Sequence, residues 1–437
     1  MKRINNSVIA LSLLLGMANI HAQEKKQLSL DEAVQLGIQN SKNLKIDAAK
    51  IEEATADLLE AKNRQLPELK VSGSYMYLPT KPTVDIKLPG TAGAGGPEVH
   101  QVAYGSVNLS VPIYSGGRIK YGIQSAKYLV EASKLSTEND KIAIAYNVAQ
   151  AYNNLFKANQ SIKVLEENLT ASQKRDETFL KLENNGVIAR NDRLKANLQT
   201  SNIELQLLDA KNNYNIANIN MDLLLGLPDN TEIEVDQNYI DENQDVKPVD
   251  YYVNEARENR KDLQALDQQR KAAELGSKAA KAENLPSIAF TGGYVAADIP
   301  KFLTIYNAVN VGVGISYNLS NLWKENSSLK QSKAREMQLS ATNELLNDNI
   351  KLDVNREYQN TDYSKKRIAV FEKSAEQANE NYRITKNKYD NGLATMTELL
   401  DADAAQISAN VGVINAKADA ALAYRKLLQT TGTLTIK

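Results

Sequence analysis

The sequence predicts an α+β protein in which pairs of short strands alternate with very long helical hairpins. Two observations support this class: the stretch from Ile123 to Asn185 holds no Gly or Pro, and the hydrophobic pattern changes twice between a helical period and strict alternation. A third observation is a constant offset of 206 positions that relates the two halves of the chain. An offset that holds over so long a stretch indicates a duplicated structural unit.

The N-terminus carries the features of a secretory signal, which we expect to span residues 1–22. Lys2 and Arg3 precede an apolar core, and Ala22 is the small residue before the expected cleavage point. Cleavage removes two cations and changes the net charge from −1 to −3, so nucleic acid is not an expected partner. The mature chain has no cysteine and one histidine, His100. We therefore expect no disulfide, metal site, cofactor or catalytic triad, and no enzyme.

Helical segments are predicted before and after each strand pair. A helix from Leu30 to Gln65 begins with a capping box of Ser29 and Glu32. The stretch free of breakers ends at Gly186, and a second one runs on to Leu225, which predicts an antiparallel helical hairpin with its tip near 186. Its first arm would be about 95 Å long.

Apolar residues at coiled-coil spacing form a seam on the returning arm, at Ile203, Leu207, Ala210, Tyr214, Ala217, Met221 and Leu224. The amides between the seams, Asn153 among them, are expected on a polar face. The second half repeats this hairpin with its tip near 392.

Two strand pairs are predicted, at residues 68–114 and 286–320, because apolar and polar residues alternate there. Strands of about ten residues can cross a bilayer when tilted. No apolar run beyond the signal approaches 18 residues, so an exported chain of this kind is either soluble outside the cytoplasm or a membrane protein of the β type. Four strands cannot close a barrel. A dimer would supply eight strands and a trimer twelve, and the residues alone leave this choice open.

The expected organisation follows from these elements. The signal peptide (1–22) precedes a first repeat (23–228), an acidic and irregular connecting segment (229–250), and a second repeat (251–437). Each repeat holds a helix, a β-hairpin and a long helical hairpin.

Three motifs then identify a family resemblance. They are Val111–Gly117 at the end of the second strand and the tip motifs from Asn185 to Asp192 and from Asn391 to Leu399. With this order, spacing and duplication, the chain resembles the TolC-type outer membrane efflux proteins over essentially its whole mature length. The resemblance implies a homotrimer in the cell outer membrane. Four transmembrane β-strands per chain would form a twelve-stranded β-barrel continuous with a twelve-helix periplasmic α-barrel.

The resemblance also implies a function. The trimer would be a passive exit duct of a tripartite efflux or type I secretion system, with a periplasmic adaptor protein and an inner-membrane RND or ABC transporter as partners. The exported cargo, whether drugs, metal ions or proteins, stays open. The alternative is a soluble periplasmic coiled-coil scaffold whose hairpins never enter lipid.

Glu398 and Asp401 match the carboxylates that ring the closed end of the tunnel in the family. They share one helix face, and three chains would place six acids around one axis. Such a ring should raise the pKa values of its members and favour a bound cation.

The family's tip lock corresponds to Tyr389 and Asp192, but Ala394 stands where the family has an arginine, and Arg190 or Arg193 are candidate substitutes. The hairpin tips are expected to dock the adaptor through Gly186, Val187, Ile188, Gly392, Leu393 and Met396.

Overall fold

The computed structural model describes residues 25–80, 82, 98–228, 231–240, 246–300 and 302–435. The predicted signal sequence lies outside these residues. The chain divides into two compact units. One contains the residues up to Ile46, Thr137–Lys261 and the residues from Leu346 onward, and the other contains Asp47–Ser136 and Asp262–Leu345. Each unit therefore takes segments from both predicted repeats.

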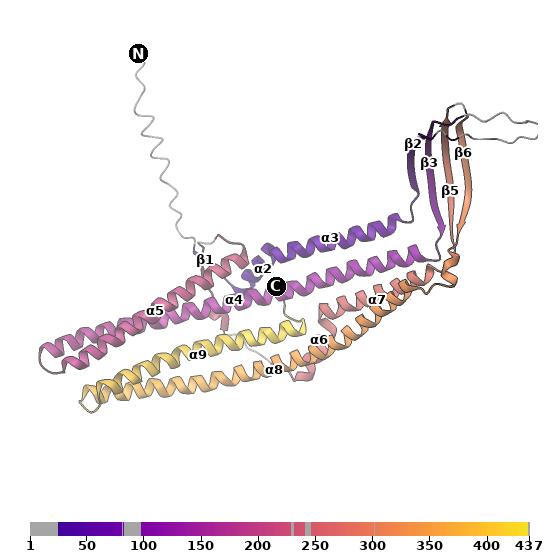
Figure 1. Cartoon of the computed structure of the whole chain (residues 1–437). Coiled ribbons are helices and arrows are strands. Elements are labelled where there is room, and N and C mark those ends of the chain that lie inside the picture. Colours follow the sequence, from indigo (N-terminus) through magenta and orange to yellow (C-terminus); the bar gives the residue numbers. More distant parts are fainter. Residues whose placement is uncertain are drawn as a thin grey trace, which may run out of the picture. The chain divides into compact units, whose positions relative to one another are not determined.

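Two long helical hairpins account for nearly half of the chain. Helix α4 (Arg118–Asn184) is followed by α5 (Arg190–Leu225), and α8 (Ser327–Asp390) is followed by α9 (Met396–Thr431). In each pair the second helix returns along the first (Figure 1). Both returning helices are 36 residues long, and their ends differ by the same 206 positions that relate the sequences. In the described chain no helix combines the length and the apolarity needed to cross a membrane.

A glycine in the left-handed conformation forms each hairpin tip. Gly186 and Gly392 both have φ of 72°, and nothing lies within 4 Å of a Cβ built on either. The following amides of Val187 and Leu393 donate to Leu182 O and Lys388 O at 2.8 Å, as in a Schellman motif. Backbone conformation, and not lack of space, therefore explains the glycines at these positions.

The helix predicted from Leu30 to Gln65 is wrong, because two helices occupy this segment. They are α2 (Leu30–Asn40) and α3 (Lys42–Asn63), and Ser41 between them has a non-helical ψ of 122°. The break places the Asn40 amide at the end of α5, where it donates to Leu225 O at 2.7 Å. An unpaired helix-terminal carbonyl thereby gains a donor.

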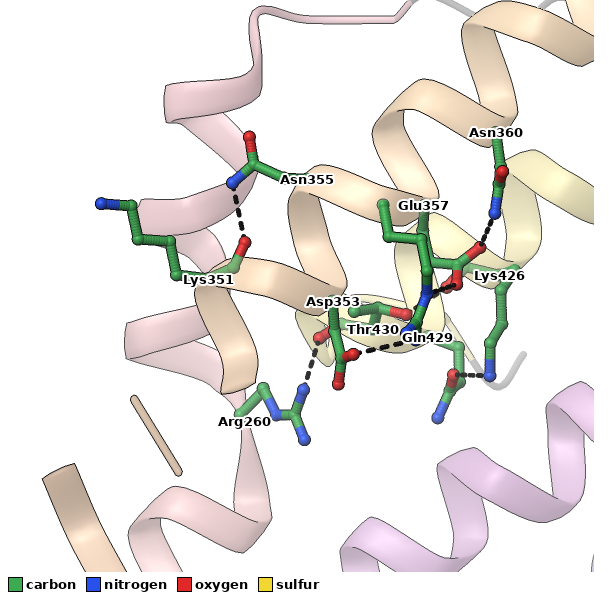
Figure 2. Close-up of polar contacts among 10 residues, drawn as sticks. Arg260, Lys351, Asp353, Asn355, Glu357, Asn360, Lys426, Gln429 and Thr430 are labelled. Atoms are coloured by element: carbon green, nitrogen blue, oxygen red, sulfur yellow. Dashed lines mark hydrogen bonds and ion pairs between the residues drawn. The ribbon is translucent and has the colours of Figure 1, made fainter. Parts of the chain in front are cut away.

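The second repeat contains the same break. Arg260 separates α6 (Val249–Asn259) from α7 (Lys261–Ala282) and has ψ of 120°. Its guanidinium donates to Thr430 O at 3.2 Å, so the end of α9 is also capped by a residue from the break (Figure 2). Along α8 in the same view, Asn360 donates to Glu357 at 3.0 Å.

Four strands form one antiparallel sheet in the order β2-β3-β5-β6. They are β2 (Glu68–Tyr77), β3 (Gln101–Tyr114), β5 (Ser287–Ile299) and β6 (Leu303–Ser316), and they lie side by side in Figure 1. The central β3–β5 pairing joins the two repeats. Among the described residues, β2 and β6 each pair with one neighbour and form the edges of the sheet.

The connecting segment is more ordered than the sequence predicts. Strand β4 (Glu232–Val235) lies in this segment and pairs in parallel with β1 (Lys25–Leu28). The Asn218 side chain on α5 holds the segment, because it donates to Thr231 O at 2.6 Å and accepts from Ile233 N at 3.0 Å. The prediction of an irregular segment is therefore wrong for its described central part.

Tyr152 on α4 connects strands β1 and β4 to the helices through hydrogen bonds. Its side chain is fully buried, and its hydroxyl donates to Leu28 O at 2.9 Å and accepts from Asp236 N at 2.7 Å. Burial raises the pKa of Tyr152 to about 12 from the ordinary value of 10. The next residue, Asn153, is also fully buried, so its predicted place on a water-facing polar face is wrong.

We expect the Tyr152→Phe variant to be less stable at neutral pH by about 1–3 kcal/mol, because the amide of Asp236 loses its acceptor. The raised pKa means that the neutral phenol stabilises the fold below pH 10 and that this contribution is lost as the pH rises towards 12. The free energy of unfolding measured between pH 8 and 12 should therefore fall by about 3 kcal/mol less for the variant than for the parent protein. Tyr251→Phe, at a half-exposed tyrosine, is the control and should follow the parent protein.

Candidate functional site

The ends of the two helical hairpins bring together most of the residues that the sequence singled out. All of them belong to the same compact unit. A buried apolar cluster, here called the tip cluster, consists of Phe179, Ala196, Met396 and Leu399. It joins α4 and α5 of the first hairpin to α9 of the second. Within one chain, the two tips are therefore packed together.

Glu398 and Asp401 are both exposed, on one face of α9 at positions three apart. The Glu398 carboxylate has a local role that sequence reasoning missed. It accepts from Thr395 N at 2.6 Å and from Thr395 Oγ1 at 2.9 Å, while Glu398 N donates to Thr395 Oγ1 at 3.2 Å. This capping box follows the Ser/Thr-x-x-Glu pattern, so the sequence did contain the signal.

The capping box determines the electrostatics of Glu398 within the single chain. The hydrogen bonds from the Thr395 backbone and side chain lower the pKa of Glu398. The direction is opposite to the one expected from a ring of like charges. An acidic ring would form only from several chains. The lowered pKa of Glu398 is the effect of its capping contacts within one chain.

Asp192 occupies the position of the first hairpin that corresponds to Glu398. Both are the third residue of the returning helix, but Ala189 stands in place of Thr395 and provides no side-chain cap. The Asp192 carboxylate instead lies 3.7 Å from Lys195 Nζ. One hairpin thus uses its acid as a cap, and the other leaves its acid available for a different contact.

We expect Thr395→Ala to destabilise the first turn of α9 by about 1 kcal/mol, because the helix loses its cap. Hydrogen exchange at the amides of this turn should become faster. In the same variant a titration should find the pKa of Glu398 closer to its ordinary value. The matched variant Ala189→Thr offers a cap to α5 and should slow exchange there. Equal exchange in parent and Thr395→Ala proteins would contradict this role.

The predicted tip lock is only partly assembled in the single chain. Tyr389 packs its ring against Phe179 at a centroid distance of 5.9 Å and lies beside the tip cluster. Burial, followed by the charge of Asp192, raises the pKa of Tyr389. In the parts of the chain that the structure describes, however, no hydrogen bond joins Tyr389 to Asp192.

Neither arginine suggested as a substitute at Ala394 joins the two hairpins. Arg193 Nε donates to Glu183 and braces the first hairpin internally. Arg190 is exposed and forms no ion pair within the described ranges. The arginine that does join the hairpins is Arg175, whose Nη2 lies 2.6 Å from Asp403 Oδ2. Sequence reasoning did not identify it.

The predicted docking residues differ in exposure. Val187 and Leu393 are 67% and 77% exposed beside their tip glycines. Ile188 is partly buried against the tip cluster. Met396 is 3% exposed within that cluster, so the expectation that it offers a contact surface is wrong for this conformation. Among the predicted docking side chains, Val187 and Leu393 therefore offer the most accessible apolar surface.

A metal centre does not form within the described residues, where no three His, Cys, Asp or Glu side chains are grouped suitably. His100 is partly exposed, with Nε2 3.7 Å from Glu98 Oε2. The candidate functional features of the described residues are therefore the acidic face of α9 and the exposed hairpin tips.

Two long antiparallel helical hairpins together with a four-stranded antiparallel sheet in one chain define a TolC-like fold, as the sequence predicts. The sequence model of the outer membrane efflux protein family matches residues 33–227 and 252–433. The chain therefore belongs to the outer membrane efflux protein family. Membership of this family confirms the predicted location in the outer membrane. No curated protein matches the sequence.

Solved structures of outer membrane proteins share the fold. The outer membrane protein VceC of Vibrio cholerae is 17% identical and has a TM-score of 0.76, with 92% of this chain and 96% of that chain covered. The Campylobacter jejuni CmeC outer membrane channel is 18% identical with a TM-score of 0.74 and coverage of 93% and 86%. The Neisseria gonorrhoeae MtrE outer membrane channel is 18% identical with a TM-score of 0.73 and coverage of 93% and 89%.

Proposed function

We propose that this protein is a passive homotrimeric exit duct of a tripartite efflux or type I secretion system. In this proposal the strands of three chains form a twelve-stranded barrel in the outer membrane, and their helices form a twelve-helix tunnel in the periplasm. The duct itself performs no chemistry. A periplasmic adaptor protein and an inner-membrane transporter of the RND or ABC class supply the cargo and the driving force.

The observation that carries the proposal is the division of the sheet into an apolar and a polar face. The pairing aligns Val71, Val107, Tyr294 and Val309 across the four strands. It aligns Lys70, Asn108, Gly293 and Asn310 in the next row. Directly paired residues share one face of a sheet. One face is therefore rich in Val, Ile, Tyr and Phe, and the other carries Lys, Ser, Asn and Thr.

The apolar face is exposed on the edge strands. On β6, Val309, Val311, Val313 and Ile315 are 63–73% exposed, and on β2, Val71 is 73% exposed. A soluble scaffold would leave this face in water, whereas lipid would cover it and the polar face would line an aqueous pore. The unpaired backbone groups of β2 and β6 require partners in lipid, which further copies of the chain would supply.

The returning helix of the first hairpin offers a second surface for other copies. Apolar side chains that are 59–63% exposed follow one another along α5, at Leu198, Leu205, Leu208, Ile216 and Leu223. On α8, Leu352, Tyr363 and Val370 are exposed to a similar degree. Stripes of this kind are typical of helices that pack against neighbours in an assembly.

The gate and the docking surface form part of the same proposal. We assign Glu398 and Asp401 to a cation-binding acidic ring at the closed end of the tunnel. Tyr389 and Asp192 form the tip lock, through packing and charge. Gly186, Val187, Gly392 and Leu393 contact the adaptor, since they are exposed at the tips.

Fractionation of cells that produce the protein tests the proposal. A heat-modifiable trimer extracted from the outer membrane by detergent, which conducts ions in planar bilayers, is the expected result. A periplasmic protein that remains soluble without detergent would support the scaffold instead. The adaptor captured by cross-linking at Val187 or Leu393 would then identify the transporter class.

A further inference from the structure

One guanidinium connects three helices of the two hairpins. Arg175 on α4 lies 2.6 Å from Asp403 on α9 and donates to the Tyr382 hydroxyl on α8 at 3.3 Å. The Arg175 and Asp403 side chains are 14% and 6% exposed. Among the ion pairs within the described chain that join the two hairpins, this one is more buried than the Lys157–Asp419 pair, whose side chains are 27% and 32% exposed.

This contact lies in a polar layer between two apolar clusters. The tip cluster lies on one side, and on the other is a second cluster of Leu165, Ile203, Leu207, Ala210 and Ile407. At the level of Arg175, the buried hydroxyls of Ser172 and Thr200 share a hydrogen bond of 2.7 Å between α4 and α5. The polar layer therefore interrupts an otherwise apolar seam at the place where the tips begin.

A buried ion pair at this place fixes the register between the hairpins without making their contact permanent. The charges attract strongly while water is excluded, but separation returns both to water and recovers their hydration. Such a pair therefore favours one alignment more than it adds net stability. This is the behaviour expected of a contact that must hold a closed state and also release it.

The duplicated positions do not contain a second ion pair of this kind. The positions related to Arg175 and Asp403 by the 206-residue offset are Asn381 and Asn197, which carry no charge. Asn197 donates instead to Asp176 within its own hairpin at 3.1 Å. The ion pair thus ties α4 to α9 of the same chain and has no charged counterpart between α8 and α5.

We propose that Arg175 and Asp403 form an intrachain latch that holds the two hairpin tips together in the closed duct, with Tyr382 as a third member. The latch rests on the proposed function, since it acts on the gate of the duct, but the separation of the tips within one chain can be measured independently of conduction.

The sequence contains no cysteine, so spin labels attach only to cysteines that are introduced at chosen positions. Spin labels at Val187→Cys and Leu393→Cys, both exposed, report the distance between the two tips of one chain by pulsed dipolar spectroscopy. Labelled chains are diluted with unlabelled ones, so that only distances within a chain contribute. The parent protein should show one short distance. Arg175→Gln and Asp403→Asn should each raise the separated population about tenfold or more, since each leaves the other charge buried without its partner.

The double variant distinguishes a latch from two independent structural roles. If the residues act as a pair, Arg175→Gln with Asp403→Asn should separate the tips no more than either single change. It also carries the test if a single variant fails to fold, because it leaves neither charge buried. Arg383→Gln is the matched control. It removes an exposed ion pair with Glu380 next to Tyr382 and should leave the distance unchanged.

Two results would overturn the latch. One is a distance between the tips that stays unchanged in the variants. The other is a separated population in the double variant that equals the product of the two single effects. Bilayer recordings of the same proteins keep the two proposals apart. Tips that separate in a protein that never conducts would refute the duct and retain the latch. A conducting parent whose tips do not respond to the substitutions would refute the latch and retain the duct.

Discussion

Replacing Val311 and Val313 together with lysine should abolish the outer-membrane trimer. Both side chains are exposed on the apolar face of edge strand β6, at 70% and 63%. If this face contacts lipid, each lysine near the middle of the bilayer costs about 2–4 kcal/mol. Two such costs are comparable with the whole stability of a typical domain. Heat-modifiable trimer in the outer-membrane fraction, assayed by gel mobility, is the measurement.

Asn310→Lys is the matched control for this experiment. Asn310 lies on the same strand in the polar row with Lys70 and Asn108, so an added lysine there should face water and permit assembly. Equal assembly of the Val311/Val313 variant and the control would show that lipid does not contact the apolar face. Failure of the control alone would show that the two faces are assigned the wrong way round.

Neutralising Glu398 and Asp401 should have the second large effect. In the proposed ring the change removes six carboxylates from a narrow axis, so binding of a blocking divalent cation should weaken about tenfold or more. Single-channel conductance should rise as well, because like charges and bound cations no longer obstruct the opening. Planar-bilayer recordings with increasing divalent cation measure both quantities.

The choice of substitutions matters because Glu398 also caps α9. Glu398→Gln with Asp401→Asn removes the charges and retains a side chain that can accept the cap hydrogen bonds, whereas alanine would also weaken the helix. Asp209→Asn, at an exposed acid of α5, controls for a general change in surface charge. Block and conductance that stay unchanged in the Gln/Asn variant would exclude these residues from the gate.

The sequence predicts the long elements well because few residue types determine them. Gly186 and Gly392 end the outgoing helices, since their positive φ suits glycine and each closes a Schellman turn. The seam of α5 is likewise buried where the coiled-coil spacing places it, for example at Ile203 and Met221. Helix breakers and hydrophobic period are local signals, and tertiary contacts here reinforce them.

The breaks and the buried polar contacts depend on residues far apart in the chain. Ser41 and Arg260 are not helix breakers, and their backbone is explained by the contacts that Asn40 and Arg260 make with the ends of α5 and α9. Strand β4 is short and acidic, and its partner β1 lies about 200 residues earlier in the sequence. No local period reveals such contacts.

The proposed gate region also depends on contacts between distant residues. Resemblance placed Glu398 and Asp401 on one exposed face, but only the structure shows that α9 buries a second stripe, which includes Asp403 and Ile407. Sequence reasoning assigned no role to Asp403. Arg175 and Asp403 are 228 positions apart, so their pairing follows from the packing of two hairpins and not from either helix alone.

The central claim is that one chain supplies only part of a closed wall. The mass of the purified mature protein, measured by analytical ultracentrifugation in detergent with the bound detergent subtracted, tests it most directly. A species of three chains that persists on dilution is the predicted result. A single chain that stays dispersed without detergent would contradict the account.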